Sequence, residues 1–264
     1  MSIILNNVIA NKYLILEQIG KGSFGTIYKG KNIRKNTVVA IKTEPIKNNT
    51  NLLLNESRIY NYLSQINIPG IPTVKWFGKD KHYYYMVIKL LGSSLQDLKN
   101  KLNIVPFKLI LQITMQILNI LKEIHNSGLV HRDVKPENFL LDLDNKQIYI
   151  IDFGFCIVYN SNNNTNNTNL IGSLNYASIN AHNNKKLYPK DDLESLGYIL
   201  IYLYSGTLPW INLTNNNEIK YQKENICFDN IPIVLSGFIK YIKSLQYDDE
   251  YPNYDILFNI INVI

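Results

Sequence analysis

The segment Gly128–Leu141, GLVHRDVKPENFLL, places several charged and polar side chains between two apolar flanks. Asp133 is followed by Lys135 two positions later and by Asn138 five positions later. Phosphoryl transfer requires a carboxylate that orients the attacking hydroxyl and accepts its proton, together with cations that stabilise the developing charge. Asp133 suits the first task, and Lys135 could touch the γ-phosphate. The structural alternative is a polar loop that only caps a helix.

A phosphoryl-transfer site also needs oxygen ligands for a divalent metal. The sequence IIDFGF, residues 150–155, places Asp152 at the end of an apolar strand, a short distance along the chain from Asn138. Carboxylate and amide oxygens are the hard ligands that Mg²⁺ prefers. We therefore expect Asn138 and Asp152 to bind Mg²⁺, with ATP as the second cofactor.

Three glycines near the N-terminus, Gly20, Gly22 and Gly25, have G-x-G-x-x-G spacing. The dinucleotide-binding form of this pattern needs a helix after the glycines, whereas TIYKG is typical of a strand. A strand–glycine loop–strand hairpin can instead fold over nucleotide phosphates, because no Cβ keeps the backbone N–H groups away. A plain tight turn is the alternative. The expected nucleotide contacts in this region are Ile19, Gly20, Lys21, Gly22, Ser23, Phe24, Gly25, Thr26 and Ile27.

A lysine follows the glycine turn at the end of the apolar strand VVAIK. For a lone lysine such as Lys42, exposure to solvent is the usual state. Its position after the glycines matches the V-A-I-K signature, in which the lysine holds the α- and β-phosphates. Glu56, on the helix expected next, could pair with Lys42 and fix its direction.

The surrounding pattern indicates which elements position these residues. Residues 13–20, 25–30, 36–44 and 83–91 have the composition of strands, and residues 51–66 have apolar residues at helical spacing. Helical patterns also cover residues 106–128, 191–206 and 232–245, the first of them ending at a glycine. The prediction is an α+β fold: a single domain over residues 1–264, with a small, mainly β lobe at about 1–91 and a larger, mainly α lobe at 92–264.

Composition excludes several other classes of protein. The 264 residues are 46% hydrophobic, and the net charge of +6 is scattered, which does not indicate a nucleic-acid groove. Cys156 and Cys227 form no disulfide framework, so a reducing compartment, by default the cytoplasm, is expected. The most apolar run, Leu196–Tyr204, is too short to span a membrane. The low-complexity segment Tyr159–Asn169 is expected to be a mobile loop, and the protein a monomer.

The glycine turn, Lys42, HRDVKPEN and IIDFGF occur in an order that resembles the eukaryotic-type protein kinases, from about Lys12 to Ile264. The resemblance implies a protein-kinase fold and transfer of the ATP γ-phosphoryl group to protein hydroxyls, and Lys135 resembles the serine/threonine class. Five segments are similar to the casein kinase 1 family, among which Ser178–Asn180 matches its Ser-Ile-Asn motif. These segments are GSLNYASIN, DDLESLGYILIY, SGTLPW, GIPTVKWFG and LLGSSLQDL.

The resemblance also assigns further roles by position. Lys89–Leu91 would form the hinge after Ile88, and the Leu91 backbone would meet adenine. Asp192 would steady the catalytic loop, and Ser173 would contact the catalytic aspartate and lysine. The residues that would enclose the adenine ring are Ile27, Ala40 and Leu140.

Two departures from the family pattern affect the expected specificity and regulation. Asn175 replaces an arginine that favours phosphorylated or acidic substrates, so we expect a weakened preference for pre-phosphorylated substrates. The uncharged 159–169 segment offers little basic charge to receive a phosphate, so we expect activity without an upstream kinase. One rival is a pseudokinase that binds nucleotide as a scaffold, although such proteins usually lack one of Lys42, Asp133 and Asp152. The other is a small-molecule phosphotransferase of related fold.

Overall fold

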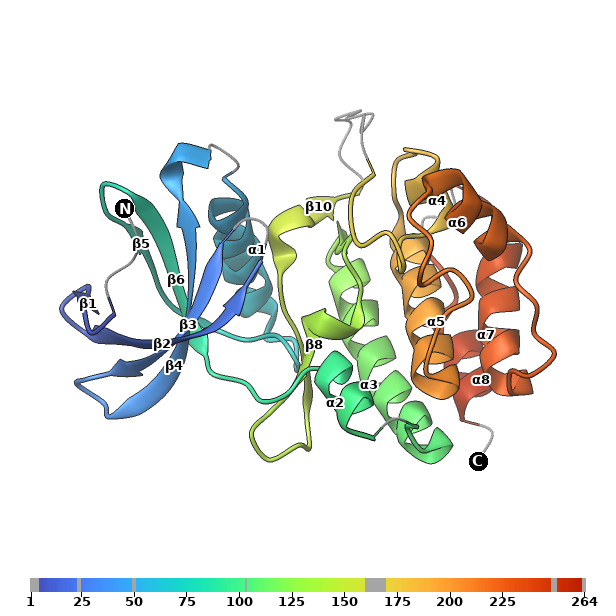
Figure 1. Cartoon of the computed structure of the whole chain (residues 1–264), viewed down its shortest axis with the longest axis horizontal. Helices are drawn as coiled ribbons and strands as arrows, with labels where there is room; N and C mark the ends of the chain where they lie inside the picture. Colours follow the sequence, from blue (N-terminus) through green and yellow to red (C-terminus); the bar gives the residue numbers. More distant parts are fainter. Residues whose placement is uncertain are drawn as a thin grey trace. The chain divides into compact units, whose positions relative to one another are not determined.

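The computed structural model describes residues 5–22, 25–48, 51–102, 104–159, 170–247 and 251–262 (Figure 1). Its contacts divide the chain into two compact units. The first unit comprises residues 1–92 and 151–154, and the second comprises 93–150 and 155–264. The short stretch 151–154, which contains Asp152, thus belongs to the first unit although the chain around it belongs to the second.

The first unit is built on a six-stranded antiparallel sheet with the strand order β1-β2-β3-β4-β6-β5. Each pair from β2 to β4 is a simple hairpin, so neighbours in sequence are neighbours in the sheet. The strands are β1 Val8–Ile9, β2 Tyr13–Lys21, β3 Thr26–Asn32, β4 Thr37–Pro45, β5 Val74–Lys79 and β6 Tyr83–Lys89.

The two faces of this sheet have different tasks. One face carries an apolar cluster that includes Tyr13, Ile15, Ile41 and Val87. The other face packs against α1, Leu52–Ile66, which follows the short 3-10 helix Ile46–Asn48 and contacts β4, β5 and β6. Because side chains alternate along a strand, the residues beside Ile41 face α1.

The second unit is mainly helical. Two short antiparallel ribbons accompany the helices: β7 pairs with β10, and β8 pairs with β9. The helices are α2 Leu95–Leu102, α3 Phe107–Asn126, α4 Ile179–His182, α5 Pro189–Ser205, α6 Asn216–Glu224, α7 Ile233–Ser244 and α8 Tyr254–Ile261. The remaining elements are β7 Leu129–Val130, the 3-10 helix Pro136–Asn138, β8 Phe139–Leu141, β9 Ile148–Ile150, the 3-10 helix Phe153–Phe155 and β10 Ile157–Val158.

Helix α5 forms the centre of the second unit. Its residues Pro189–Leu203 are all buried, and it packs against α3, α4 and α7. Gly197 allows the close approach of α7, because a Cβ there would lie 2.7 Å from Cγ1 of Ile239. A helix buried on every side holds fixed positions for the polar groups in its first turn, which reach the candidate site.

The predicted α+β class is confirmed, and the predicted strands and helices are present with ends shifted by a few residues. Helix α3 ends at Asn126, and Gly128 follows with a φ of +80°, the left-handed conformation that favours glycine. The sequence interpretation did not identify α2, α6, α8 or β5. Helices α2 and α6 have few buried apolar residues: α2 buries Leu95, and α6 buries Ile219 and Lys223.

Several expectations fall outside the described residues. These are the contacts of Ser23 and Phe24 and the mobility of residues 160–169. Among the described helices, none combines the length and apolar character needed to cross a membrane.

Candidate active site

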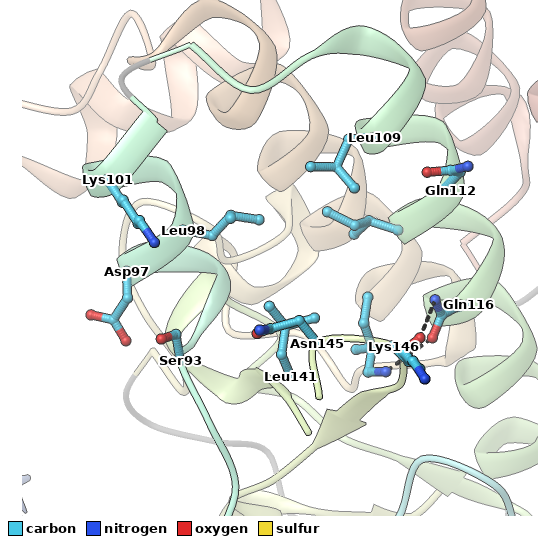
Figure 2. Close-up of a pocket in the computed structure, with 12 residues that line it drawn as sticks. Ser93, Asp97, Leu98, Lys101, Leu109, Gln112, Gln116, Leu141, Asn145 and Lys146 are labelled. Atoms are coloured by element: carbon cyan, nitrogen blue, oxygen red, sulfur yellow. Dashed lines mark hydrogen bonds between the residues drawn. The ribbon is translucent and has the colours of Figure 1, made fainter. Parts of the chain in front are cut away.

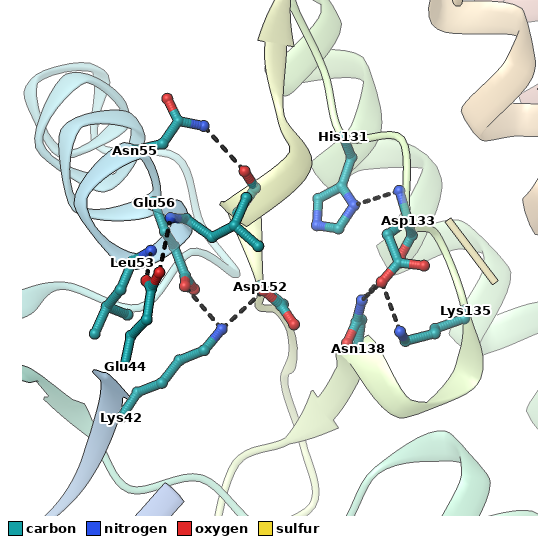
Figure 3. Close-up of polar contacts among 12 residues, drawn as sticks. Lys42, Glu44, Leu53, Asn55, Glu56, His131, Asp133, Lys135, Asn138 and Asp152 are labelled. Carbon is teal, nitrogen blue, oxygen red and sulfur yellow. Dashed lines mark hydrogen bonds and ion pairs between the residues drawn. The ribbon is translucent and has the colours of Figure 1, made fainter. Parts of the chain in front are cut away.

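The catalytic loop places Asp133 at the centre of a small polar network (Figure 3). The side chain is buried, and its Oδ2 accepts hydrogen bonds from Nζ of Lys135 at 2.6 Å and from Nδ2 of Asn138 at 3.2 Å. The same Nδ2 also donates to the Asp133 carbonyl at 2.8 Å. The other carboxylate oxygen, Oδ1, is buried and has no hydrogen-bond partner among the described residues. One oxygen is thus held in place, while the other is a buried acceptor without a donor among the described residues.

The loop is fixed to the core through Asp192, in the first turn of α5. Its carboxylate accepts backbone N–H donors of His131 at 2.7 Å and Arg132 at 2.9 Å, and Nε2 of His125 lies 3.0 Å from Oδ2. Burial would raise the pKa of Asp192, but the contact with His125 and the charge of His131 outweigh burial and lower it. Asp192 therefore steadies the residues that precede Asp133.

The backbone of the loop is held in an uncommon conformation. Arg132 has a φ of +69°, and its Nε donates to the carbonyl of Phe155 at 2.6 Å. Asp152 likewise has a φ of +70°. Left-handed conformations are uncommon in residues other than glycine and cluster at functional sites.

A second polar group lies in the first unit around Lys42 (Figure 3). Its Nζ lies 2.8 Å from Oε2 of Glu56 and 2.8 Å from Oδ1 of Asp152. The Glu56 side chain is only 2% exposed, whereas that of Asp152 is 37% exposed. The expected pairing of Lys42 with Glu56 is present, and Asp152 joins it. The alternative of a solvent-exposed lysine is therefore wrong for Lys42.

Burial and charge act in opposite directions on this group. Burial would lower the pKa of Lys42, but attraction to Glu56 and Asp152 outweighs burial and raises it. Burial raises the pKa of Glu56, and the charge of Lys42 limits that rise. Lys42 thus remains a cation, available to an anionic ligand such as a phosphate.

Two residues that sequence reasoning missed place α1 and hence Glu56. The carboxylate of Glu44, two residues after Lys42 on β4, accepts the backbone N–H groups of Leu52 at 3.3 Å and Leu53 at 2.5 Å. Asn55 donates from Nδ2 to the carbonyl of Gly154 at 3.1 Å. The sequence offered no signal for Glu44, because a helix is usually capped by the residue next to it and not by a neighbouring strand.

The glycine turn is a hairpin between β2 and β3, as expected, with Gly20 opposite Ile27 and the N–H of Gly22 bonded to the Gly25 carbonyl at 2.9 Å. Only Gly25 is required by packing, because a Cβ there would lie 2.0 Å from the carbonyl oxygen of Thr43. A Cβ on Gly22 would meet only the Gly25 oxygen, at 3.9 Å. Close approach of a ligand would explain glycine at position 22, and packing does not.

Two of the expected adenine contacts, Ile27 and Ala40, lie on the same face of the sheet as Lys42. Lys42 pairs with Ile27 across β3 and β4, and Ala40 lies two residues before Lys42, so the three side chains point to the same side. Ile88 pairs with Ala40 and belongs to that face as well. Leu91 follows β6 in the first unit.

The remaining nucleotide contacts of the prediction are distributed as follows. Ile19, on β2, is 49% exposed, and Lys21 pairs with Thr26 at the end of the hairpin. Leu140 lies on β8 in the second unit. Their roles in nucleotide binding stay predictions.

The segment from Gly172 to Asn180 lies beside the catalytic loop. A Cβ on Gly172, whose φ is +94°, would lie 2.6 Å from the Arg132 carbonyl oxygen and 3.6 Å from Oδ1 of Asp133. Among the described residues, the Ser173 hydroxyl makes no hydrogen bond to Asp133 or Lys135, so the expected contact is absent. The Ser173 carbonyl instead accepts backbone N–H groups of the following turn.

The Ser-Ile-Asn motif forms the start of α4 and is hydrogen-bonded to α5. Ser178 caps α4 by accepting the N–H of Ala181 at 3.1 Å. The N–H of Ile179 donates to Oε1 of Glu194 at 2.9 Å, and Asn180 donates from Nδ2 to Asp191 at 3.0 Å. Sequence reasoning did not identify the two α5 carboxylates.

Asn138 in the second unit and Asp152 in the first each offer an oxygen of the kind that a hard divalent cation binds. The amide nitrogen of Asn138 is bound to Asp133, which leaves its Oδ1 as the ligating atom, and Asp152 offers a partly exposed carboxylate. Within the described ranges, no three His, Cys, Asp or Glu side chains gather as a metal site. Mg²⁺ commonly takes only one or two carboxylates and completes its shell with water and substrate phosphates.

A separate pocket lies on the second unit between α2, α3 and the β8–β9 turn (Figure 2). Its volume is about 560 Å³, and none of the catalytic, metal or nucleotide residues discussed above lines it. Asp97 supplies the one carboxylate of its lining. The Oδ2 atom of Asp97 accepts hydrogen bonds from the N–H of Ser94 at 2.9 Å and from the Ser94 hydroxyl at 2.7 Å. The pocket therefore plays no part in the site built around Asp133.

Comparison with known families gives one match over most of the chain. The model of the protein kinase domain matches residues 13–250. The matched range includes the glycine turn, Lys42, the Asp133 loop and the segment from Gly172 to Asn180.

Proposed function

Because this chain belongs to the protein kinase family, whose α+β fold it has, we propose that it transfers the γ-phosphoryl group of ATP to serine and threonine hydroxyls of proteins. The observation that carries this proposal is the state of Asp133. Its Oδ2 is held by Lys135 and Asn138, while Oδ1 is buried without a partner. A carboxylate oxygen in that state can orient a substrate hydroxyl and accept its proton.

The other residues act on the phosphates in this mechanism. The glycine turn and Lys42 hold the phosphates, and Glu56 fixes the direction of Lys42. Lys135 stabilises the charge that develops on the transferred group. Bound Mg²⁺ supplies neutralisation of the phosphate oxygens, and Asn138 and Asp152 would hold it.

Membership of a casein kinase 1-like group is supported by the Ser178–Asn180 motif. In this chain the motif is anchored by Glu194 and Asp191 of α5 through its backbone N–H and its amide. These contacts give the Ser-Ile-Asn sequence a defined structural task. Preference for serine and threonine over tyrosine is supported by Lys135, which resembles the serine/threonine class.

Activity without an upstream kinase is supported by the way the segment after Gly172 is held. Its described contacts run to the side chains of Glu194 on α5, Lys223 on α6 and Trp210. A loop that is ordered by its own contacts has no need of an added phosphate to order it.

A weaker preference for pre-phosphorylated substrates is supported by Asn175. An amide offers neither the charge nor the paired donors with which a guanidinium binds a phosphate. Kinase assays on matched peptides, phosphorylated or acidic upstream of the acceptor, test this part. A strong bias toward the phosphorylated peptides would contradict it.

The central test is phosphoryl transfer by the protein made in bacteria and treated with phosphatase. With ATP and Mg²⁺, we expect labelling of casein and of serine and threonine peptides, but not of tyrosine peptides. Asp133→Asn should reduce transfer by about a thousandfold or more while ATP binding stays within about twofold, because the base is lost and the phosphate contacts are not. ATP binding without transfer in the unaltered protein would instead favour a nucleotide-binding scaffold.

A further inference from the structure

Lys223, on α6, is a fully buried lysine in the second unit. Its Nζ donates to the carbonyl oxygens of Leu174 at 2.9 Å and Ala177 at 2.7 Å, and it lies 2.9 Å from Nε2 of His182. The rings of Tyr198 and Trp210 lie 4.9 and 5.5 Å from the same nitrogen. Lysine is almost never fully buried without partners. These contacts enclose the amine on several sides.

His182 provides the third acceptor for the Lys223 amine, because its ring is neutral at pH 7. Burial, aided by the charge of Lys223, lowers the pKa of His182 to about 4, so its ring is neutral at pH 7. Its Nδ1 lies 2.5 Å from Oδ1 of Asn216 and therefore carries the proton. Nε2 is then an acceptor for Lys223. Burial lowers the pKa of Lys223 itself to about 7, and when the amine is protonated each of its three protons has an acceptor.

The backbone that Lys223 holds follows Gly172, which lies against the catalytic loop. Gly172 lies against Arg132 and Asp133, and Leu174 is two residues further along the chain. From another position in the fold, Nε1 of Trp210 donates to the carbonyl of Asn175 at 2.8 Å. Three carbonyls of Leu174–Ala177, here called the acceptor segment, are thus bound by side chains from α6 and from the α5–α6 connection.

The position of the acceptor segment indicates what its anchoring controls. A hydroxyl that reaches Oδ1 of Asp133 must pass close to Gly172 and the residues after it. The Lys42 group belongs to the first unit, whereas Lys223 and the acceptor segment belong to the second. A loss of anchoring should therefore affect the protein substrate and leave ATP binding unchanged.

We propose that Lys223 is a positioning residue for the phosphate acceptor, which fixes the acceptor segment beside Asp133 and so determines how the protein substrate is bound. This role rests on the proposed kinase function. An apolar residue of similar size could fill the same volume at less cost than a buried amine, so space filling alone does not explain a lysine here.

The test compares Lys223→Met with Lys240→Met, the same change at an exposed lysine of α7. The first should raise the KM for a peptide substrate by about tenfold, because two charge-assisted hydrogen bonds to the segment are lost, while the KM for ATP stays within about twofold. The control should change neither value. Equal changes in both KM values, or an unchanged peptide KM in a folded variant, would overturn the proposal.

A milder variant and a second measurement cover the case in which Lys223→Met does not fold. Trp210→Phe keeps an aromatic ring but removes the donor to Asn175, and it should raise the peptide KM by a smaller factor, also without change in the ATP KM. Hydrogen exchange of residues 172–180 should be faster in both variants, with β3 and β4 unchanged. Exchange needs no activity, so it separates failure of this role from failure of the kinase function. Unchanged exchange in folded variants would overturn the role of Lys223.

Discussion

The Lys42 group of the first unit and the Asp133 group of the second are held in different ways. Lys42 is fixed by charge, through two carboxylates each 2.8 Å from its Nζ. The loop around Asp133 is fixed by backbone N–H donors that meet one buried carboxylate, Asp192. The first arrangement orients a side chain, and the second orients a stretch of backbone.

This difference predicts different consequences of mutation. When an ion-paired side chain is replaced, its function is lost but stability is largely kept, because the buried partner can take up a proton. A carboxylate that collects backbone donors cannot be neutralised without leaving donors unpaired, so its loss affects both folding and catalysis. Substitutions in the two groups should therefore separate activity from stability.

Among the residues that fix these two groups, Lys42 should give the largest loss of activity when it is replaced. Lys42→Met removes the cation that holds the phosphates, and kcat should fall by about 100- to 1000-fold. The free energy of unfolding should change by about 1 kcal/mol or less, because Glu56, whose pKa burial already raises, can become neutral. Steady-state kinetics and urea unfolding measure the two quantities. A large loss of stability would contradict the proposed difference between the groups.

Replacement of Asp192 should affect both quantities. Asp192→Asn puts an NH₂ group in place of one acceptor oxygen, so a backbone donor of the catalytic loop loses its partner. We expect the free energy of unfolding to fall by about 3 kcal/mol and kcat to fall by about tenfold or more. Asp255→Asn is the control, because that side chain is 84% exposed and its nearest cation, on Lys122, is 3.8 Å away. Retention of full stability by Asp192→Asn would remove the basis of the comparison.

The glycine turn separates activity from stability within a single hairpin. Gly25→Ala should lower the free energy of unfolding by about 2 kcal/mol or more, because its Cβ would overlap the Thr43 carbonyl oxygen. Gly22→Ala should leave stability nearly unchanged but weaken ATP binding by about tenfold, because its Cβ would keep phosphates from the backbone. Thermal unfolding and nucleotide titration of both variants decide this. Equal effects on stability would show that packing, not a ligand, requires Gly22.

His182 lies outside both groups, and its effect should be visible only as a dependence of stability on pH. Its pKa is about 4 in the folded protein, below the ordinary value of 6.5 that applies when unfolded. Between these values the unfolded chain binds a proton that the folded protein does not, so stability falls as the pH drops from 6.5 to 4. The contribution is at most about 3 kcal/mol. His182→Gln should flatten the unfolding free energy over that range, and an unchanged slope would contradict the assignment.

The proximity of several candidate site residues could be predicted because they lie in short, ordered segments. Asp133, Lys135 and Asn138 fall within six residues, so their proximity follows from local backbone alone. The strand character of TIYKG excluded a dinucleotide-binding turn, and β3 is a strand. By contrast, the described residues show no hydrogen bond from the Ser173 hydroxyl to Asp133 or Lys135, although the Ser173 carbonyl accepts the N–H groups of Tyr176 and Ala177.

Periodicity depends only on local geometry, so the α+β class could be predicted from the sequence. The same holds for short spacings, which gave the identity and order of the candidate site residues. Tertiary structure alone decided which groups support them. Glu44 caps α1, and Lys223 reaches carbonyls 46 and 49 positions away in the chain. Such contacts depend on how distant segments pack, and a buried polar group carries no sequence pattern that names its partner.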